Sequence, residues 1–380
     1  MHQIRIITTI SSISEEQWSK LQANGNPFLA YPFLSALENH DCLSKWGWQT
    51  QFVCLYAKDD LIAAIPMYLK DNSYGEFVFD SAWADAYARS GLRYYPKLVA
   101  AVPYTPATGA RLLIHQDNTD ASLRTELVNA ALSHAEELNV SSLHYLFTNE
   151  TDTQELERSG LLRRTGCQFH WQNNTYVDFD DFLSTLSSKK RKQIRKERRD
   201  VQASGLEIEL LHGTETQPHH WDVFYNFYAS TFARKSGYAT LTREFFEALS
   251  KDMPEQVILV LAKHDGEYVA GTFNLLGEST LYGRHWGCKH TYSGLHFELC
   301  YYQLIEYCIE NRIKRFEAGA QGEHKLSRGF LPTETWSMHW LAHPEFHDAI
   351  AEFLQHEHKG VKDYMDVLDE HSPFKKTGDS

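Results

Sequence analysis

The chain has 380 residues, of which 42% are hydrophobic and 23% are charged, a composition that excludes a disordered protein and is typical of a folded globular one. At this length, two domains are expected. The 37 basic and 50 acidic residues give a formal net charge of −13, which argues against broad, non-specific nucleic-acid binding and leaves room for a local basic patch.

Cysteine spacing and hydropathy indicate a reduced, cytoplasmic protein. The six cysteines are scattered without a CxxC pair, which favours free thiols over a disulfide or zinc framework. The start of the chain lacks the apolar core of a signal peptide, and no run of about 18 apolar residues occurs, so we expect no membrane insertion. The 20 histidines form no zinc signature, and no metal is predicted.

The first half predicts a mixed α/β domain over residues 1–175. A strand at the start is followed by a helix capped by Ser14 and a second helix after Pro27. The segments QFVCLYA and LIAAIPMYLK predict a β-hairpin, and EFVFD predicts a third strand. After a long irregular connection, helix SLRTELVNAALSHAEELN and strand SSLHYLF complete the unit, with a short helix and another strand behind them.

The long connection from Trp83 to Arg111 is rich in aromatic residues. Connections of this length are usually functional or mobile. One interpretation is a packing cluster, the usual meaning of aromatic residues. The other is an acceptor pocket, in which aromatic walls stack on a flat or sugar-like ligand and a carboxylate orients an amine. The candidate acceptor-binding residues are Trp83, Asp85, Tyr87 and Tyr104.

The second half repeats this order and predicts a second domain over residues 176–380. A hairpin of QVILVLA and YVAGTFNLLG is followed by strand LYGRHWG, a helix at 295–311 and strand RFEAGA. Two copies of the same unit indicate a duplicated mixed α/β domain with a boundary near Tyr176, where the insertion in the first copy is the long aromatic connection. A long amphipathic helix is expected near the C-terminus.

Between the halves, residues 187–204 predict a strongly basic helix. Eight Lys or Arg lie between Lys189 and Arg199, and only Glu197 and Asp200 can neutralise them. Two interpretations remain open: a solvated helix face, or an anion site for the phosphates of a nucleotide, a coenzyme or an RNA backbone. The candidate residues for such a site are Lys190, Lys192 and Arg195.

Polar side chains also gather where the strands of the second half end. In α/β sheets, ligands bind beyond the carboxyl ends of strands. Strand LYGRHWG carries Arg284 and His285, RFEAGA carries Glu317, and the polar loop that follows supplies Gln321, Glu323, His324, Lys325 and Arg328. The alternative to a ligand site is an ordinary solvent-exposed loop.

Several long segments resemble those of a known family. The runs NPFLAYPFLSALE, HFELCYYQLIEYCIE and FEAGAQGEHKLSRGF, together with the basic helix, are similar to bacterial peptidoglycan biosynthesis or recognition proteins and to the Fem-type aminoacyltransferases, within the GNAT acyltransferase superfamily. The resemblance implies tandem GNAT-like domains, an acyl donor that is either an acyl-CoA or an aminoacyl-tRNA, and an amine acceptor such as a peptidoglycan precursor. It also implies that Lys325 stabilises an oxyanion or a phosphate.

One segment departs from the GNAT pattern. Acetyl-CoA-dependent GNAT enzymes follow their fourth strand with a glycine-rich turn that holds pyrophosphate at a helix N-terminus. This chain has CKHTYSGLHFELC there, with Gly294 as its single glycine. The usual coenzyme A cradle is therefore not predicted.

Acyl transfer to an amine requires a proton acceptor and a donor group for the developing oxyanion. The candidate bases are Glu317, Glu323, His324 and His285, the oxyanion cations are Lys325 and Arg284, and Arg284 and Arg328 are also candidates for holding the donor. These residues predict an N-acyltransferase. The alternative is a non-catalytic protein that recognises a cell-wall precursor or a nucleic acid through the basic helix.

Overall fold

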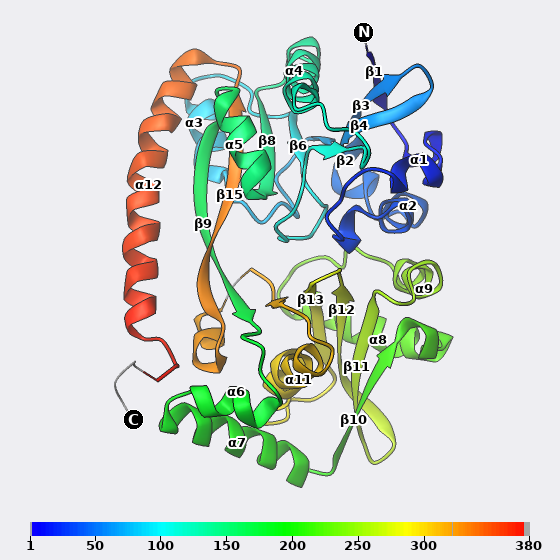
Figure 1. Ribbon diagram of the computed structural model, residues 1–380, viewed down its shortest axis with the longest axis vertical. Coiled ribbons are helices and arrows are strands. Elements are labelled where there is room, and N and C mark those ends of the chain that lie inside the picture. The colour runs from blue at the N-terminus through cyan, green and yellow to red at the C-terminus, as the bar shows by residue number, and fades with distance from the viewer. Residues whose placement is uncertain (1, 321, 376–380) are drawn as a thin grey trace. The chain divides into compact units, whose positions relative to one another are not determined.

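The computed structural model describes residues 2–320 and 322–375 (Figure 1). Gln321 of the predicted polar loop lies outside them. The chain divides into two compact units, Met1–Cys167 with Glu334–Tyr364, and Gln168–Thr333 with Met365–Ser380. Within the described residues, no helix has the length and apolar character needed to span a bilayer.

The first unit contains two sheets. Strands β1, β3, β4 and β7 form one in the order β1-β3-β4-β7, and β15, β8, β6, β5 and β2 follow one another in the other. Helix α4 packs its apolar face on the β3–β4 hairpin. The elements are β1 (Gln3–Ile7), α1 (Glu15–Ser19), α2 (Tyr31–Asn39), β2 (Trp48–Thr50), β3 (Phe52–Ala57), β4 (Asp60–Ile65), β5 (Tyr68–Lys70), α3 (Ser81–Arg89), β6 (Lys97–Ala100), β7 (Leu113–Ile114), α4 (Ser122–Glu137), β8 (Ser142–Thr148) and α5 (Glu150–Arg158).

Two strands pass from one unit into the other. Strand β9 (Leu162–Gln172) begins in the first unit and ends in the second, and β15 (Leu331–Leu341) runs in the opposite sense. Because β15 pairs antiparallel with β8 from Trp336 to Leu341, residues 334–364 belong to the first unit. This differs from the predicted domain of residues 176–380, since hydrogen bonding between strands remote in sequence decides the division.

The segment Glu76–Asp80 is not the predicted third strand. Phe77 has φ +60, a left-handed conformation outside the β region, and residues 76–80 form no strand. The strand that runs parallel to β8 is instead β6, with Leu98 opposite Leu143. The predicted irregular connection from Trp83 to Arg111 was also wrong in part, because it contains most of α3 and all of β6.

A buried lysine explains the irregular path of this segment. The ammonium of Lys97 is inaccessible to solvent and binds the carboxylates of Glu76, at 2.8 Å, and Asp80. It also donates to Ser73 Oγ at 2.8 Å. Because a buried charge must be paired, the chain from Ser73 to Asp80 turns both carboxylates inward and gives up strand geometry.

This ion pair generates a stability prediction. Lys97→Met should lower the free energy of unfolding by about 3–5 kcal/mol, because two buried carboxylates then lose their counter-ion. Urea denaturation at pH 7 measures it, with the exposed Lys359→Met as the matched control. An unchanged midpoint in Lys97→Met would contradict the buried pairing.

The second unit is a six-stranded arrangement in the order β10-β11-β12-β13-β14-β9. Helix α8 packs on β12 and β13, and the helical segment after β13 packs against α6, α7 and the sheet. The elements are α6 (Phe179–Thr185), α7 (Ser188–Ala203), β10 (Leu206–His212), α8 (Pro218–Arg234), α9 (Arg243–Asp252), β11 (Val257–His264), β12 (Glu267–Leu276), β13 (Thr280–Cys288), α10 (Leu295–Phe297), the π-helical turn η5 (Glu298–Tyr302), α11 (Gln303–Glu310), β14 (Arg315–Glu317) and the 3-10 helix η6 (Glu323–Arg328). Helix α12 (Pro344–Glu370) starts in the first unit and ends in the second.

The two units repeat one connection. In the first, the parallel strands β6 and β8 are joined through α4, and in the second, the parallel strands β13 and β14 are joined through the α10–η5–α11 segment. The polar loop expected after RFEAGA is instead the turn η6, in which Lys325, Leu326 and Arg328 are buried.

Candidate active site

Strands β13 and β14 run together for only three residue pairs. Thr280, Leu281 and Tyr282 lie opposite Arg315, Phe316 and Glu317, and the parallel pairing ends there. Strand β13 continues to Cys288 paired with β12 alone. The end of this short parallel pairing is the reference point for the site, because Arg284 and His285 follow it on one strand and Gly319 and η6 follow it on the other.

Arg284 is the extra residue of a β-bulge. Strand β12 places Phe273 opposite His285 and Asn274 opposite Gly283, so Arg284 has no opposing residue in the ladder. A bulge re-aims the side chain it carries, and bulges are common beside active sites. Burial lowers the pKa of Arg284 to about 10, offset in part by Tyr228 and Glu317, and leaves the guanidinium charged at neutral pH.

The helix after β13 is irregular at the same level. Residues Glu298–Tyr302 form a π-helical turn between α10 and α11, and all five are buried. Single π turns inside helices frequently mark functional sites. The turn places Cys300 within electrostatic range of Lys325, and burial raises the pKa of the Cys300 thiol, which therefore stays protonated and is a poor nucleophile.

Lys325 is a buried ammonium with one protein acceptor. Its side chain is 2% exposed, and its Nζ donates to the carbonyl oxygen of Gly319 at 2.8 Å. Within the described residues, that is its single hydrogen bond, so two of its three N–H groups remain available to a ligand. Burial lowers the pKa of Lys325 to about 8.

A buried carboxylate, Glu317, lies at the end of the β13–β14 pairing. It is 3.1 Å from Arg315 and 4.0 Å from His170 on β9. Arg284 lies within electrostatic range of Glu317, and Lys325 lies within electrostatic range of His170. Burial lowers the pKa of His170 to about 3, and the imidazole is neutral at physiological pH.

The candidate proton acceptors are neutral imidazoles. His324 Nε2 lies 2.8 Å from the hydroxyl of Tyr301, and which of the two groups donates depends on the tautomer of the ring. Part of the His324 ring is desolvated although the residue is exposed, and this, together with Arg328 and Lys325, lowers the His324 pKa. Burial raises the pKa of Tyr301, so its hydroxyl keeps its proton at neutral pH. His285 has a pKa well below its usual range because of burial and Arg284, and Tyr228 packs on its ring. The carboxylate of Glu323 is exposed.

Arg328 is engaged with the protein. Both oxygens of the Glu197 carboxylate accept from its Nη2 at 3.0 Å, its Nη1 donates to the His324 carbonyl, and its guanidinium lies 3.4 Å from the centre of the Phe297 ring. Its charge is therefore neutralised, and it fixes the position of η6 relative to α7. This is a different role from the predicted contact with a donor.

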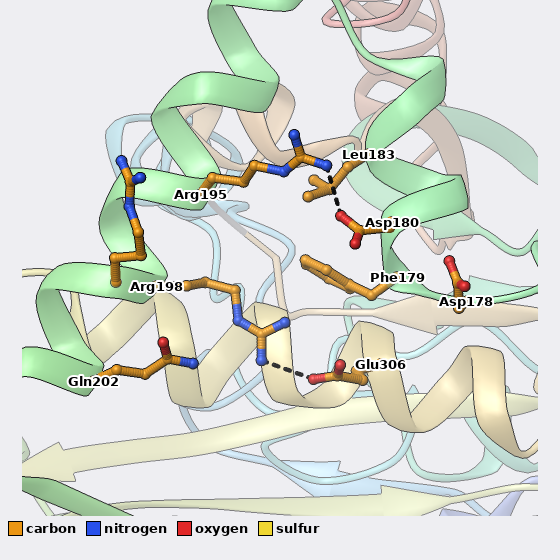
Figure 2. Close-up of a pocket in the computed structure, with 9 residues that line it drawn as sticks. Asp178, Phe179, Asp180, Leu183, Arg195, Arg198, Gln202 and Glu306 are labelled. Carbon is orange, nitrogen blue, oxygen red and sulfur yellow. Dashed lines mark hydrogen bonds and ion pairs between the residues drawn. The ribbon is translucent and has the colours of Figure 1, made fainter.

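The cations predicted on the basic helix do not share a pocket with η6, because no residue of η6 lines the cleft that Arg195 lines. Arg195 lines a cleft of about 550 Å³ between α6, α7 and α11, where it pairs with Asp180 at 2.7 Å, and Arg198 pairs with Glu306 (Figure 2). Lys192 is exposed and Lys190 is half-buried. These residues form a surface separate from Lys325.

In the first unit, the predicted acceptor residues are mostly packed. Trp83 is buried with its ring edge-on to His339, and Tyr87 is buried against Phe346. Tyr104 is buried and donates to the Cys42 carbonyl at 2.6 Å. Asp85 lies exposed on α3. These surroundings agree with the interpretation as a packing cluster. The use of these residues as an acceptor pocket stays a prediction.

Several residues of the site were not singled out from sequence. His170 and Tyr301 lie in apolar segments and read as core, and Glu197 reads as one of the few acids on a basic helix. The signal that could have identified Tyr301 is its position in HFELCYYQLIEYCIE, where an aromatic residue follows a cysteine inside a helix. Spacing alone does not reveal the π turn that aims it at His324.

The buried ammonium of Lys325 is expected to lower the stability of the fold, whereas that of Lys97 is expected to raise it. The folded pKa of about 8 lies below the ordinary value of 10.5, so the charged form destabilises the fold below pH 8 and this loss disappears as pH rises through 10.5. Lys325→Met should therefore raise the free energy of unfolding at pH 7 by on the order of 1–3 kcal/mol.

Urea denaturation at pH 7 and pH 10.5 measures this difference, which should shrink at the higher pH. The exposed Lys314→Met is the matched control and should change little at either pH. A destabilised Lys325→Met at pH 7 would show that the ammonium is held by more than the Gly319 carbonyl.

The chain is similar to several solved structures. The crystal structure of FemX matches with a TM-score of 0.55 and 10% identity, over 92% of this chain and 100% of that one. L-PGS from Bacillus licheniformis matches with a TM-score of 0.49 and 12% identity, over 84% and 95% of the two chains. A tandem GNAT protein from the clavulanic acid biosynthesis pathway gives 0.46 and 11%, over 90% and 99%. No curated protein sequence matches this chain.

The likeness to FemX shows that the chain shares its fold, and the predicted mixed α/β class is confirmed. A model of the FemAB_like family, described as peptidoglycan biosynthesis/recognition, matches residues 9–376. The match covers nearly the whole sequence, and the chain therefore belongs to the FemAB_like family.

Proposed function

We propose that the protein is an N-acyltransferase that moves an acyl or aminoacyl group onto an amine of a peptidoglycan precursor. The observation that carries this proposal is the buried ammonium of Lys325, which has one acceptor among the described residues and follows the end of the β13–β14 pairing in the chain. A buried cation with free N–H groups is suited to a charge that develops only during reaction. Family membership supports the cell-wall acceptor.

In this proposal, Lys325 stabilises the oxyanion. The amine nitrogen attacks the carbonyl carbon of the donor, the C=O bond becomes a C–O⁻ single bond, and the ammonium donates to that oxygen. The low dielectric around a side chain that is 2% exposed strengthens this interaction. Arg284, re-aimed by its bulge, supplies a second positive charge within electrostatic range of the Glu317 carboxylate.

His324 accepts the proton that the attacking amine loses. Its imidazole is neutral at pH 7, since its pKa is lowered. In the tautomer in which Nε2–H donates to the Tyr301 hydroxyl, this bond orients the ring and Nδ1 keeps the lone pair that takes up the proton. Collapse of the intermediate restores the C=O bond and expels the leaving group, an alcohol or a thiol, which takes up a proton. The donor is thus an acyl ester or thioester, as in an aminoacyl-tRNA or an acyl-CoA.

The alternative is a non-catalytic protein that binds a cell-wall precursor or a nucleic acid. It predicts binding without turnover. Incubation of the purified protein with charged tRNA or acyl-CoA and a precursor carrying a free amine separates the two, with product detected by mass spectrometry. Binding of a precursor with no product from either donor class would favour the alternative.

Removal of the ammonium tests the mechanism directly. Lys325→Met should lower kcat by about 10²–10³-fold with little change in KM, because the lost contact forms in the transition state. Lys314→Met should keep wild-type turnover. Since Lys325→Met is also expected to be at least as stable as the wild type, a loss of activity cannot be attributed to unfolding, and full activity would remove Lys325 from the mechanism.

The pH profile gives an independent test. The cation is present below the Lys325 pKa of about 8 and is lost above it, so kcat should fall as pH rises through about 8. Lys325→Arg should move this falling limb to higher pH, because a guanidinium keeps its proton. The profile is measured under single-turnover conditions. An identical limb in both proteins would assign it to another group.

A further inference from the structure

The first unit contains a cleft that the proposed function does not use. It has a volume of about 340 Å³ and lies between the end of α1, the turn of the β3–β4 hairpin and the segment that follows β7. Its lining includes Lys20, Asp60, Leu61, His115 and Asp117. We call this space the hairpin cleft. Small-molecule sites in proteins have volumes from about 300 to 1,000 Å³, so the hairpin cleft can hold a small metabolite.

Backbone hydrogen bonds fix the walls of the hairpin cleft. The segment after β7 is bonded to the end of α1, because the N–H of Gln116 donates to the Lys20 carbonyl at 2.9 Å. The same segment is bonded to β4, because the N–H of His115 donates to the Ile62 carbonyl at 2.8 Å. These bonds hold the walls in place before a ligand arrives, and a preformed site loses little conformational entropy on binding.

The hairpin cleft contains donors suited to an anionic group. The ammonium of Lys20 pairs with Glu16 at 2.9 Å, but the two side chains are 44% and 82% exposed, so the pair is weak and its other N–H groups can bind a ligand. The Nδ1 of His115 accepts from the N–H of Asp117 at 3.2 Å. The neutral ring therefore carries its proton on Nε2, which is a second donor. Asn118 adds a side-chain amide to the lining.

Two carboxylates and an apolar surface complete the lining. Asp60 and Asp117 are exposed, and both lie within electrostatic range of the Lys20 ammonium. Leu61 and Ile62 are buried and also line the cleft. The hairpin cleft therefore presents charges of both signs beside apolar side chains.

Ligands with a single kind of polar group fit this lining poorly. Asp60 and Asp117 repel a simple anion, and Lys20 repels a simple cation. Among the described residues, no group of three or more His, Cys, Asp or Glu could hold a metal ion. None of the described lining residues is Phe, Tyr or Trp, so the cleft lacks the aromatic platform on which a sugar or a base would stack. A small molecule that carries both charges remains.

We propose that the hairpin cleft binds a free α-amino acid with an apolar side chain. Its carboxylate accepts from Lys20 and from Nε2 of His115, and its ammonium donates to Asp60 and Asp117. Its side chain packs on Leu61. The site does not depend on the proposed function, because a free amino acid has no leaving group on its carboxylate and is not an acyl donor.

Binding is measured by a ligand-observed NMR titration of the full chain with L-leucine at pH 7. The dissociation constant should be on the order of 1 mM, because the charged groups of the cleft reach solvent, which weakens each ion pair. 4-Methylpentanoate lacks the ammonium and 3-methylbutylamine lacks the carboxylate, so each should bind about 10-fold more weakly. Absence of saturable leucine binding would overturn the proposal, and so would equal affinity for either analogue.

Two double variants place the ligand in the cleft. Asp60→Asn/Asp117→Asn should weaken leucine binding by about 10-fold, because it removes the charge of both acceptors and keeps the shape of their side chains. Asp41→Asn/Asp59→Asn removes the same charge from exposed positions outside the cleft and should bind leucine like the wild type. If the two double variants bound leucine equally well, the amino acid would lie elsewhere and the proposal would be wrong.

Lys20→Met tests the contact with the ligand carboxylate. It should weaken leucine binding several-fold and leave the affinity for 3-methylbutylamine no lower, because the amine has no carboxylate to lose a contact. That split distinguishes a lost contact from a damaged cleft. Lys58→Met removes an exposed charge outside the cleft and is the control. Leucine affinity equal to that of the control would overturn the proposed orientation and, with it, the site. Failure of these binding tests leaves the transferase proposal intact, since none of them uses an acyl donor.

Discussion

The ion pair between Glu197 and Arg328 is the contact on which the arrangement of the second unit depends. It joins the basic helix α7 to the turn η6, and η6 carries both His324 and Lys325. Tyr302 also donates to Glu197, and Phe297 packs on the Arg328 guanidinium, so the helical segment after β13 is held by the same pair. Because Arg328 is 3% exposed, loss of either partner would leave an uncompensated charge inside the protein.

The second unit also contains several backbone irregularities. Arg284 occupies a β-bulge, Glu298–Tyr302 form a π turn, and Gly319 and Gly322 adopt positive φ values of 81° and 117° on the way to η6. At Gly322, a Cβ would lie 2.5 Å from the His324 ring, so a side chain there would displace the imidazole. Regular strands and helices would not bring Arg284, His324 and Lys325 to the end of one short parallel pairing.

The sequence predicted those elements whose residues alternate or repeat in a simple way. The two hairpins, the basic helix and the strands SSLHYLF and RFEAGA are present because their apolar periodicity matches the face they bury. The segment EFVFD has the same alternation and is not a strand, since Glu76 and Asp80 turn inward to the buried Lys97. Lys97 lies 17 positions from Asp80 and 21 positions from Glu76, so no local sequence pattern indicates these ion pairs.

The candidate site could also be predicted only in part, because some of its contacts join residues that are remote in sequence. Lys325, His324 and Arg284 were singled out from polar residues next to strands. The structure places His324 and Lys325 on η6 and Arg284 in the bulge of β13, and their common role in one site stays a prediction. Arg328 was also singled out, but its partner Glu197 lies 131 positions away, and only the folded chain shows that its charge is already neutralised. His170 reaches the site because β9 pairs with β14, which sequence order does not indicate.

A comparison of two buried lysines separates the roles of the units. Lys97 in the first unit binds two carboxylates and a hydroxyl, so its charge is cancelled and its three N–H groups are occupied. Lys325 in the second unit binds one neutral carbonyl, and its charge is uncompensated among the described residues. A buried cation that lacks a full set of hydrogen-bond partners lowers the stability of the fold. Proteins retain such a cation where a ligand or a transition state supplies the missing negative charge. This contrast supports the proposal that chemistry takes place in the second unit, whereas the buried charges of the first unit stabilise its fold.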